Sequence, residues 1–219
     1  MVEALGSIAF GPLALQETYL FASDHRVRTD ANEQYIEVTG DFSSYVDDPY
    51  QQAPEREPVF DHVDVAIIGG GFGGLLMGGR LSEAGFNDVR VIEKGGDFGG
   101  TWYWNRYPGA ACDVVSYDYL PLLDELDYVP VNHYSRGPEI FAHCQAIADK
   151  YNLYELSVFN TTVTETRWDD TDQLWHVSTD RGDVMRAQFV ICANGTLAKP
   201  KLSTISGMTS FSGHSFHTS

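Results

Sequence analysis

The stretch Asp64-Val-Ala-Ile-Ile-Gly-Gly-Gly-Phe-Gly-Gly74 decides the fold predicted for this chain. Its opening is a short apolar run rich in β-branched side chains, which is typical of a buried parallel strand. The glycines that follow have the spacing G-x-G-x-x-G, in which Gly69 makes a tight turn and Gly71 lets a pyrophosphate approach the backbone. Gly74 lets the next helix pack on the strand, and Gly78, one turn later, keeps that contact tight. The helix would present N–H groups and its positive dipole end to phosphates.

The residues after this turn complete a βαβ unit. The predicted helix closes at Gly85, a natural residue for the position after a helix, and the run from Asp88 to Glu93 is the next strand. Glu93 lies 19 residues after Gly74, where a carboxylate that binds a ribose is expected. An acid at this position favours an unphosphorylated ribose, and therefore FAD or NAD over NADP. The sequence thus predicts a dinucleotide site.

The rest of the chain extends this plan. A helix is predicted from Gly137, with Pro138 in its first turn, and residues 160–167 and 173–179 alternate as antiparallel strands do. A turn at 181–183 and a buried strand at Phe189–Cys192 follow. The helix has an apolar stripe that consists of Ile140, Phe141, Cys144, Ile147, Ala148 and Tyr151. We predict an α/β, Rossmann-like domain over residues 61–200 with a small antiparallel β insertion. An arm over residues 1–60, with one short helix near Leu13–Phe21, precedes it.

The composition argues against several classes of partner. The net charge is −17 and the pI is about 4.5, whereas binding to nucleic acid or to an anionic membrane needs clustered Lys and Arg. No apolar run approaches the roughly 20 residues that span a bilayer. The first 20 residues hold no Lys or Arg, unlike the start of a signal peptide. The three cysteines have neither metal-ligand nor disulfide-scaffold spacing. We expect a soluble, cytoplasmic protein with no metal site.

A second stretch, Gly99 to Gly109, reads GGTWYWNRYPG and continues as AACDVVSYDYL up to Leu120. It resembles the FAD-contacting loop of Baeyer–Villiger monooxygenases. Ala193-Asn194-Gly195, before Lys199, resembles the point at which such chains leave the FAD domain. Phe211 to His217 fits F-x-G-x-x-x-H, the first part of the family's signature. Residues 1–60 resemble the N-terminal extension of one subgroup, so the resemblance covers nearly the whole chain.

The resemblance implies roles for individual residues in FAD binding. Gly69, Gly71 and Gly74 would cradle the FAD pyrophosphate, and Glu93 would hold the adenosine ribose. Val163 would contact the adenine through its backbone. The residues that would line the flavin are Thr101, Trp102, Tyr103, Trp104, Asp113, Val114 and Tyr119.

It also implies contacts to a second cofactor, NADPH. Ala111, Cys112 and Asp113 would approach its nicotinamide, although Ala111 stands where some family members carry Arg, so a charge contact is not expected there. Asp113 would be the catalytic residue, because it orients the arginine on which the oxygen chemistry depends. The alternative for Asp113 is a cap of a helix or turn. His217 would belong to a linker that couples two nucleotide domains.

The implied activity is that of an FAD-dependent, NADPH-using monooxygenase that converts a ketone and oxygen into an ester or lactone, in secondary metabolism. The sequence holds one G-x-G-x-x-G, and residues 201–219 resemble the start of a linker to a missing NADPH domain. Three interpretations stay open. The chain is a truncated family member, one half of a split enzyme whose second chain carries the NADPH domain, or a non-catalytic FAD- or NAD-binding module. A yellow protein that does not oxidise NADPH would favour the last.

Overall fold

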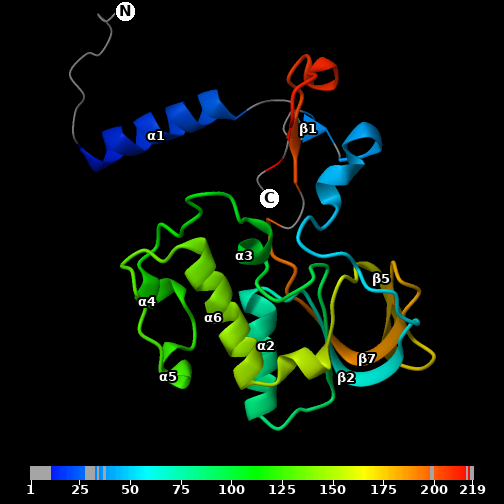
Figure 1. The fold of residues 1–219 in the computed structure, drawn as a ribbon. Coiled ribbons are helices and arrows are strands. Elements are labelled where there is room, and N and C mark those ends of the chain that lie inside the picture. Colours follow the sequence, from blue (N-terminus) through cyan, green and yellow to red (C-terminus); the bar gives the residue numbers. More distant parts are fainter. Residues whose placement is uncertain are drawn as a thin grey trace, which may run out of the picture. The chain divides into compact units, whose positions relative to one another are not determined.

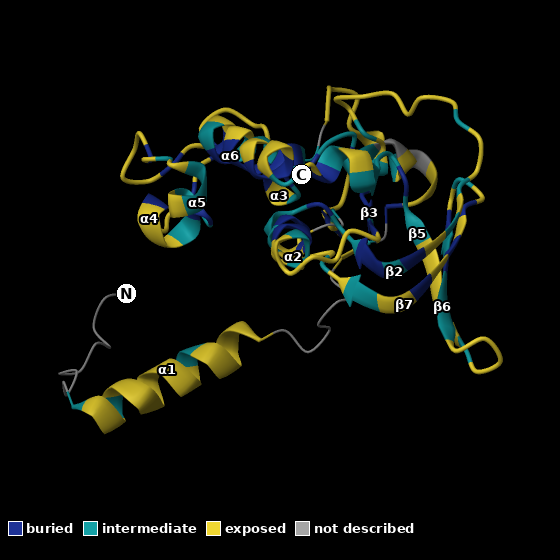
Figure 2. Ribbon diagram, turned by 90° about the horizontal axis from the view of Figure 1, so that it is seen from below, coloured by how far each residue is buried: buried dark blue, intermediate teal, exposed yellow. Residues whose placement is uncertain are grey.

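The computed structural model describes residues 11–27, 33, 35, 36, 38–197, 200–215 and 217. The chain divides into two compact units, one of residues 1–40 with 201–214 and one of residues 41–200 with 215–219. The first unit contains α1 (Pro12–Arg26), which begins with Pro12 at a position where proline is well tolerated. The short helix predicted near Leu13–Phe21 is therefore confirmed and extends further. Figure 2 shows that α1 is mostly exposed.

A small antiparallel pairing completes the first unit. β1 (Tyr35–Ile36) pairs with β8 (Leu202–Ser203), with Tyr35 opposite Ser203. The ammonium of Lys201 lies 5.3 Å from the centre of the Tyr35 ring, a cation–π arrangement. The turn η4 (Met208–Ser210) follows Gly207, whose φ of +92° is in the left-handed region.

The second unit is built on a six-stranded sheet with the order β4-β3-β2-β7-β6-β5. Figure 1 labels three of its strands, β2, β7 and β5. The strands are β2 (Phe60–Ile68), β3 (Val89–Ile92), β4 (Ser157–Val158), β5 (Val163–Asp169), β6 (Leu174–Thr179) and β7 (Val184–Cys192). β4, β3, β2 and β7 are parallel, whereas β6 pairs antiparallel with both β7 and β5. The predicted α/β, Rossmann-like fold with a small antiparallel insertion is therefore confirmed.

The other elements of this part of the chain are α-helices and short 3-10 helices, the latter labelled η. The longer helices, α2 (Phe72–Glu83) and α6 (Gly137–Lys150), lie side by side (Figure 1). The shorter elements are η2 (Gly40–Val46), α3 (Thr101–Trp104), α4 (Ser116–Tyr119), α5 (Leu123–Leu126) and η3 (Leu153–Leu156). α2 ends as predicted, because Gly85 follows it with a φ of +86°.

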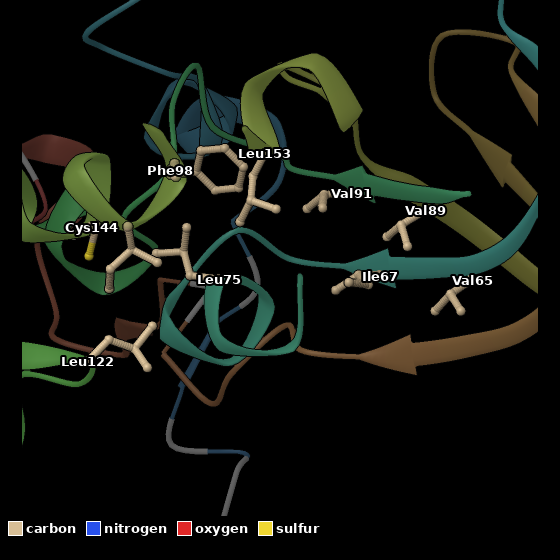
Figure 3. Packing of buried hydrophobic residues seen from close by; sticks show 11 residues of the cluster. Val65, Ile67, Leu75, Val89, Val91, Phe98, Leu122, Cys144 and Leu153 are labelled. Atoms are coloured by element: carbon tan, nitrogen blue, oxygen red, sulfur yellow. The ribbon is translucent and has the colours of Figure 1, made fainter. Parts of the chain in front are cut away.

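The core lies between the parallel strands and these helices. Side chains of β2 and β3 such as Val65, Ile67 and Val91 pack with Leu75 of α2 and Cys144 of α6 (Figure 3). A second cluster joins residues of β2 and β3 to residues of β6 and β7, and it contains Val63, Ala66, Ile92, Val177, Met185 and Ala187. Figure 2 shows the dark blue of buried residues along much of β2 and β3. The apolar run that predicted β2 is thus buried, as a parallel strand requires.

Three local predictions differ from the structure. The last strand, predicted as buried over Phe189–Cys192, begins at Val184, and both Phe189 and Cys192 are exposed. The contact of Gly78 is with η3, since a Cβ on Gly78 would lie 3.0 Å from Leu153 rather than against a strand. The strand predicted from residue 160 begins at Val163, because Asn160 adopts a φ of +51°. The next residue, Thr161, donates its N–H to the carbonyl of Glu93 at 3.0 Å. Asn160 and Thr161 therefore bond to the end of β3 and the loop after it, and the hairpin contacts begin at Thr162, which bonds to Asp180.

Candidate functional site

A cavity of about 320 Å³ opens where β2, β3 and β7 end and α2 begins. In open α/β sheets, ligands bind at the carboxyl ends of the parallel strands. The residues around this cavity are Ile68, Gly69, Gly71, Phe72, Gly73, Ile92, Glu93, Lys94, Gly99, Gly100, Thr101, Trp102, Trp104, Tyr119, Thr161, Thr162, Val163, Ala193, Asn194, Gly195 and Leu197. Eight of the fourteen residues predicted from the sequence are among them, namely Gly69, Gly71, Glu93, Thr101, Trp102, Trp104, Tyr119 and Val163.

Two glycines of the turn are required by the protein itself. Gly69 has a φ of +108°, and a Cβ there would lie 2.5 Å from the carbonyl oxygen of Ala193. A Cβ on Gly74 would lie only 1.9 Å from the carbonyl oxygen of Gly69. Both distances are far below van der Waals contact. Gly74 does not line the cavity. It lets α2 pack closely against the turn at Gly69.

Gly71 differs from both. Its φ of −78° is one that any residue adopts, and the nearest atom to an added Cβ would be the Cα of Gly100 at 3.5 Å. Nothing in the protein therefore demands glycine at this position. Gly71 lines the cavity as the residue before α2, where the first-turn N–H groups have no acceptor within the helix. A glycine here fits a ligand that approaches the backbone closely, such as a pyrophosphate.

Glu93 is buried at the cavity edge, with 5% of its surface exposed. Its Oε2 accepts the N–H of Gly70 at 2.5 Å, and its Oε1 accepts the N–H of Gly95 at 2.6 Å. Burial raises the pKa of the Glu93 carboxyl, and the two backbone hydrogen bonds oppose that shift. The carboxylate thus ties the glycine turn to the loop after β3. This second role was not predicted from the sequence.

Aromatic residues of α3 and α4 form another part of the wall. The indole Nε1 of Trp102 donates to the Tyr119 hydroxyl at 2.9 Å, and the two rings meet edge to face at 5.9 Å. Burial raises the pKa of Tyr119, so this hydroxyl stays protonated. Phe72 packs edge to face on Tyr119 at 5.6 Å. Lys94 lies on the same cavity, with its ammonium 5.0 Å from the centre of the Trp104 ring.

Tyr103 does not line the cavity. Its side chain is completely buried, and its hydroxyl donates to Oδ2 of Asp48 at 2.5 Å. Burial and this carboxylate together raise the pKa of Tyr103. Its neighbours Trp102 and Trp104 line the cavity. Tyr103 instead anchors α3 to Asp48 through its hydroxyl.

The segment predicted to meet the nicotinamide lies away from the cavity lining. Ala111, Asp113 and Val114 are exposed, whereas Cys112 is buried and donates its N–H to the carbonyl of Ser135 at 3.0 Å. α4 begins after this segment without a side-chain capping hydrogen bond. The roles assigned to these residues, including catalysis by Asp113, stay predictions.

Several cavity residues were not assigned a role from the sequence. Lys94 directly follows Glu93 in the sequence, so its place beside the cavity could have been predicted. The motif Ala193-Asn194-Gly195 was recognised, but as a domain exit rather than as a cavity wall. Thr161 and Thr162 carry no motif that points to them. Of the other residues on which the resemblance relied, Lys199 and Phe216 lie outside the described residues.

One side-chain group elsewhere has the donor atoms of a metal site. Asp169, Asp172 and His176, at the β5–β6 turn, offer ligand atoms within 4.8 Å of one another. These atoms already have partners, since His176 Nε2 lies 2.8 Å from Asp172 and Arg167 donates to Asp169 at 2.9 Å. These hydrogen bonds explain why the three side chains lie close together at the turn. Within the part of the chain that the structure describes, none of the helices is long and apolar enough to cross a membrane.

Comparisons with known proteins agree with this geometry. The model of an NAD(P)-binding Rossmann-like domain matches residues 67–123. Neopentalenolactone D synthase of Streptomyces avermitilis is 52% identical over 207 residues, and a Baeyer–Villiger monooxygenase of Stachybotrys chlorohalonatus is 45% identical over 214 residues. These matches cover 94% and 97% of the chain, but 35% and 34% of the two relatives. The chain thus spans about a third of the length of the curated relatives it matches.

Comparison with solved structures also finds similarity to monooxygenases. The polycyclic ketone monooxygenase of Thermothelomyces thermophila is 34% identical, with a TM-score of 0.82 over 93% of this chain and 36% of its own. The structure of OTEMO in complex with FAD and NADP is 34% identical, with a TM-score of 0.67 over 74% of this chain and 30% of its own.

Proposed function

The chain belongs to the Baeyer–Villiger monooxygenase family, and on that premise we propose that its cavity binds FAD and that the whole protein is an FAD-dependent, NADPH-using monooxygenase. Its reaction is the conversion of a ketone and oxygen into an ester or lactone. Support for the ketone comes from the relatives, one of which is named a polycyclic ketone monooxygenase. A lipophilic, cyclic ketone is the proposed substrate class.

The observation that carries the proposal is the contrast among the glycines of the turn. Gly69 and Gly74 are demanded by contacts within the protein, whereas Gly71 has room for a Cβ in the protein alone. Gly71 nevertheless lines the cavity at the start of α2. A dinucleotide pyrophosphate that approaches the backbone is the ligand that this arrangement fits.

The other cavity residues fit the remaining parts of FAD. The ribose belongs beside Glu93, whose carboxylate oxygens keep lone pairs beyond the two hydrogen bonds they accept. The adenine belongs beside Val163 and the threonines before it. The flavin ring belongs beside Trp102 and Tyr119. Support for this order comes from the lining of the cavity and from the dinucleotide-binding arrangement of such turns.

Bound FAD supplies the electron transfer and the oxygen activation that no side chain provides. The chain's own residues bind and orient the cofactor and exclude water from it. Trp102 and Tyr119 present rings joined by a hydrogen bond, which keeps their indole and hydroxyl groups satisfied where water is excluded. Asp113 and the nicotinamide contacts of Ala111 and Cys112 belong to this proposal as the family resemblance implies them.

The experiment that tests this function is direct. The chain is purified, and the visible absorbance of bound flavin is measured before and after addition of FAD or NAD. We expect about one FAD per chain, displaced poorly by NAD. The activity is tested on the whole protein, to which NADPH and a panel of cyclic ketones are added, and we expect esters or lactones by mass spectrometry. A chain that takes up NAD but no FAD would contradict the proposal.

A further inference from the structure

The segment Asp48–Val59, called the strap below, contacts the loop after β3 at its first residue. Oδ1 of Asp48 accepts the N–H groups of Tyr50 and Gln51, at 2.8 and 3.2 Å. Oδ2 accepts the N–H of Gly96 at 3.1 Å and the hydroxyl of Tyr103 at 2.5 Å. The approach is close, since a Cβ on Gly96 would lie 2.3 Å from Oε1 of Gln51. One carboxylate thus joins the strap to two places in the β3–α3 region.

Both places adjoin the cavity. Gly96 follows the residue whose N–H Glu93 accepts, and Tyr103 lies in α3 between two tryptophans that line the cavity. The strap adds a second contact here, because the Tyr50 hydroxyl donates to the carbonyl of Trp104 at 3.1 Å. The guanidinium of Arg106 lies over the rings of Tyr50 and Tyr103, at 4.0 and 4.5 Å.

Further along the strap, Arg56 contacts a different wall of the cavity. Its guanidinium donates to both carboxylate oxygens of Asp183, at 2.6 and 2.7 Å, and its Nη2 also donates to Oγ1 of Thr161 at 3.0 Å. The side chain of Asp183 is fully buried, and it also accepts the N–H of Val59 at 2.7 Å. Thr161 is a cavity residue and donates its N–H to the carbonyl of Glu93.

Neither Asp48 nor Arg56 is a cavity residue. Arg56 holds Thr161, which is one. Asp48 acts one step further away, through Tyr103, whose neighbours Trp102 and Trp104 line the cavity. The two walls they contact, α3 with the loop before it and residues 161–163, are far apart in the sequence. A single short segment therefore fixes their positions by charged hydrogen bonds, which are stronger than neutral ones. We propose that the strap is part of the FAD site, with Asp48 and Arg56 as positioning residues that set the spacing of these walls and so the retention of FAD. This inference rests on the proposed function.

The test measures the FAD dissociation constant of the full chain and its variants by quenching of flavin fluorescence. The temperature is set well below the unfolding midpoint of each apo variant. Asp48→Asn and Arg56→Met should each raise the dissociation constant about tenfold, which is the effect of losing roughly one net hydrogen bond that positions a wall. Arg56→Lys keeps the charge beside Asp183 and loses the fork, so its effect should be smaller. Matched controls are Asp47→Asn, at the exposed neighbour, and Arg167→Met, at an exposed ion pair on β5; both should stay within twofold.

A second readout separates positioning from general stability. The visible circular dichroism of bound flavin reports the walls around it, and it should change in Asp48→Asn but not in Asp47→Asn. An unchanged dissociation constant and spectrum, with only a lower apo midpoint, would show that the strap merely stabilises the fold and would overturn the inference. If Arg56→Met does not fold, Asp48→Asn and Arg56→Lys decide. Failure of the unsubstituted chain to bind FAD would instead overturn the proposed function, and this inference with it.

Discussion

Glu93 has two tasks at the residue scale, which makes its substitution informative. It accepts two backbone N–H groups from separate loops, and in the proposed function it also accepts ribose hydroxyls. Glu93→Ala should weaken FAD binding by about 1.5–3 kcal/mol, the range for hydrogen bonds to a charged group. It should also lower the free energy of unfolding of the apo chain. Glu93→Gln, which keeps one acceptor oxygen, should lie between. Flavin titration and urea unfolding measure the two effects, and equal FAD affinity in Glu93→Ala would contradict the ribose contact.

The Arg56–Asp183 pair gives the fold a pH dependence. The guanidinium and the hydrogen bonds from Thr179 and Val59 hold the pKa of Asp183 well below its ordinary value of 3.8. A carboxyl with a lowered folded-state pKa stabilises the fold above its ordinary pKa, and that stabilisation is lost as the pH falls toward the folded-state value. Asp183→Asn should therefore lower the free energy of unfolding by about 3 kcal/mol at pH 7, because it leaves Arg56 unpaired.

The difference between Asp183→Asn and the parent should shrink at pH 3. Urea unfolding at both pH values measures it, with Asp172→Asn at the exposed β5–β6 turn as the control. A difference that is the same at pH 3 and pH 7 would show that the Asp183 charge does not stabilise the fold.

The contacts of individual side chains were the part of the structure that the sequence predicted least well. The position of Glu93 followed from its spacing to the glycines, since both belong to one βαβ unit. Asp48, Arg56 and Asp183 carry no such signal, because their partners lie far along the chain. Tyr103 was expected beside the flavin from its neighbours, but a four-residue helix turns adjacent side chains in different directions, and its own points to Asp48.

At the scale of the element, α2 depends on the glycine at its first turn. A Cβ on Gly74 would lie 1.9 Å from the carbonyl of Gly69, and backbone atoms cannot yield as a flexible side chain does. Gly74→Ala should therefore lower the free energy of unfolding of the apo chain by about 3 kcal/mol or more, the upper range for overpacking. Gly78→Ala meets only the side chain of Leu153 at 3.0 Å and should cost clearly less. Thermal and urea unfolding compare the two. Similar losses for both would mean that α2 can shift away from the turn.

Elements with strong local signals were predicted well, and short ones were not. β2, α2 and β3 followed from an apolar run, a glycine turn and a closing glycine. β4 has two residues, too few for any periodicity, and its pairing with β3 is decided by packing. The start of β5 was placed three residues early, because alternation continues through Asn160 while its backbone turns away.

At the scale of the whole molecule, the boundary between the two compact units does not coincide with the end of the polar arm that the composition predicts. The arm over residues 1–60 was predicted from its polar sequence, and the division between units falls at Gly40 and again at Lys201. The strap thus belongs to the unit that holds the cavity. Composition could not show this, because the strap is held by a few hydrogen bonds and not by an apolar stripe. The predicted domain limits stay predictions about the family's organisation.

The central claim is that the cavity is shaped for the pyrophosphate of FAD, and Gly71 tests it most directly. FAD is titrated into the parent chain, Gly71→Ala, Gly71→Val and the control Gly11→Ala, where an added Cβ meets nothing within 4 Å. Unfolding of each apo chain is measured alongside. We predict that the parent and Gly11→Ala bind about one FAD, that Gly71→Ala binds weakly, and that Gly71→Val binds none while its apo chain stays folded. Full flavin absorbance in a folded Gly71→Val would contradict the claim.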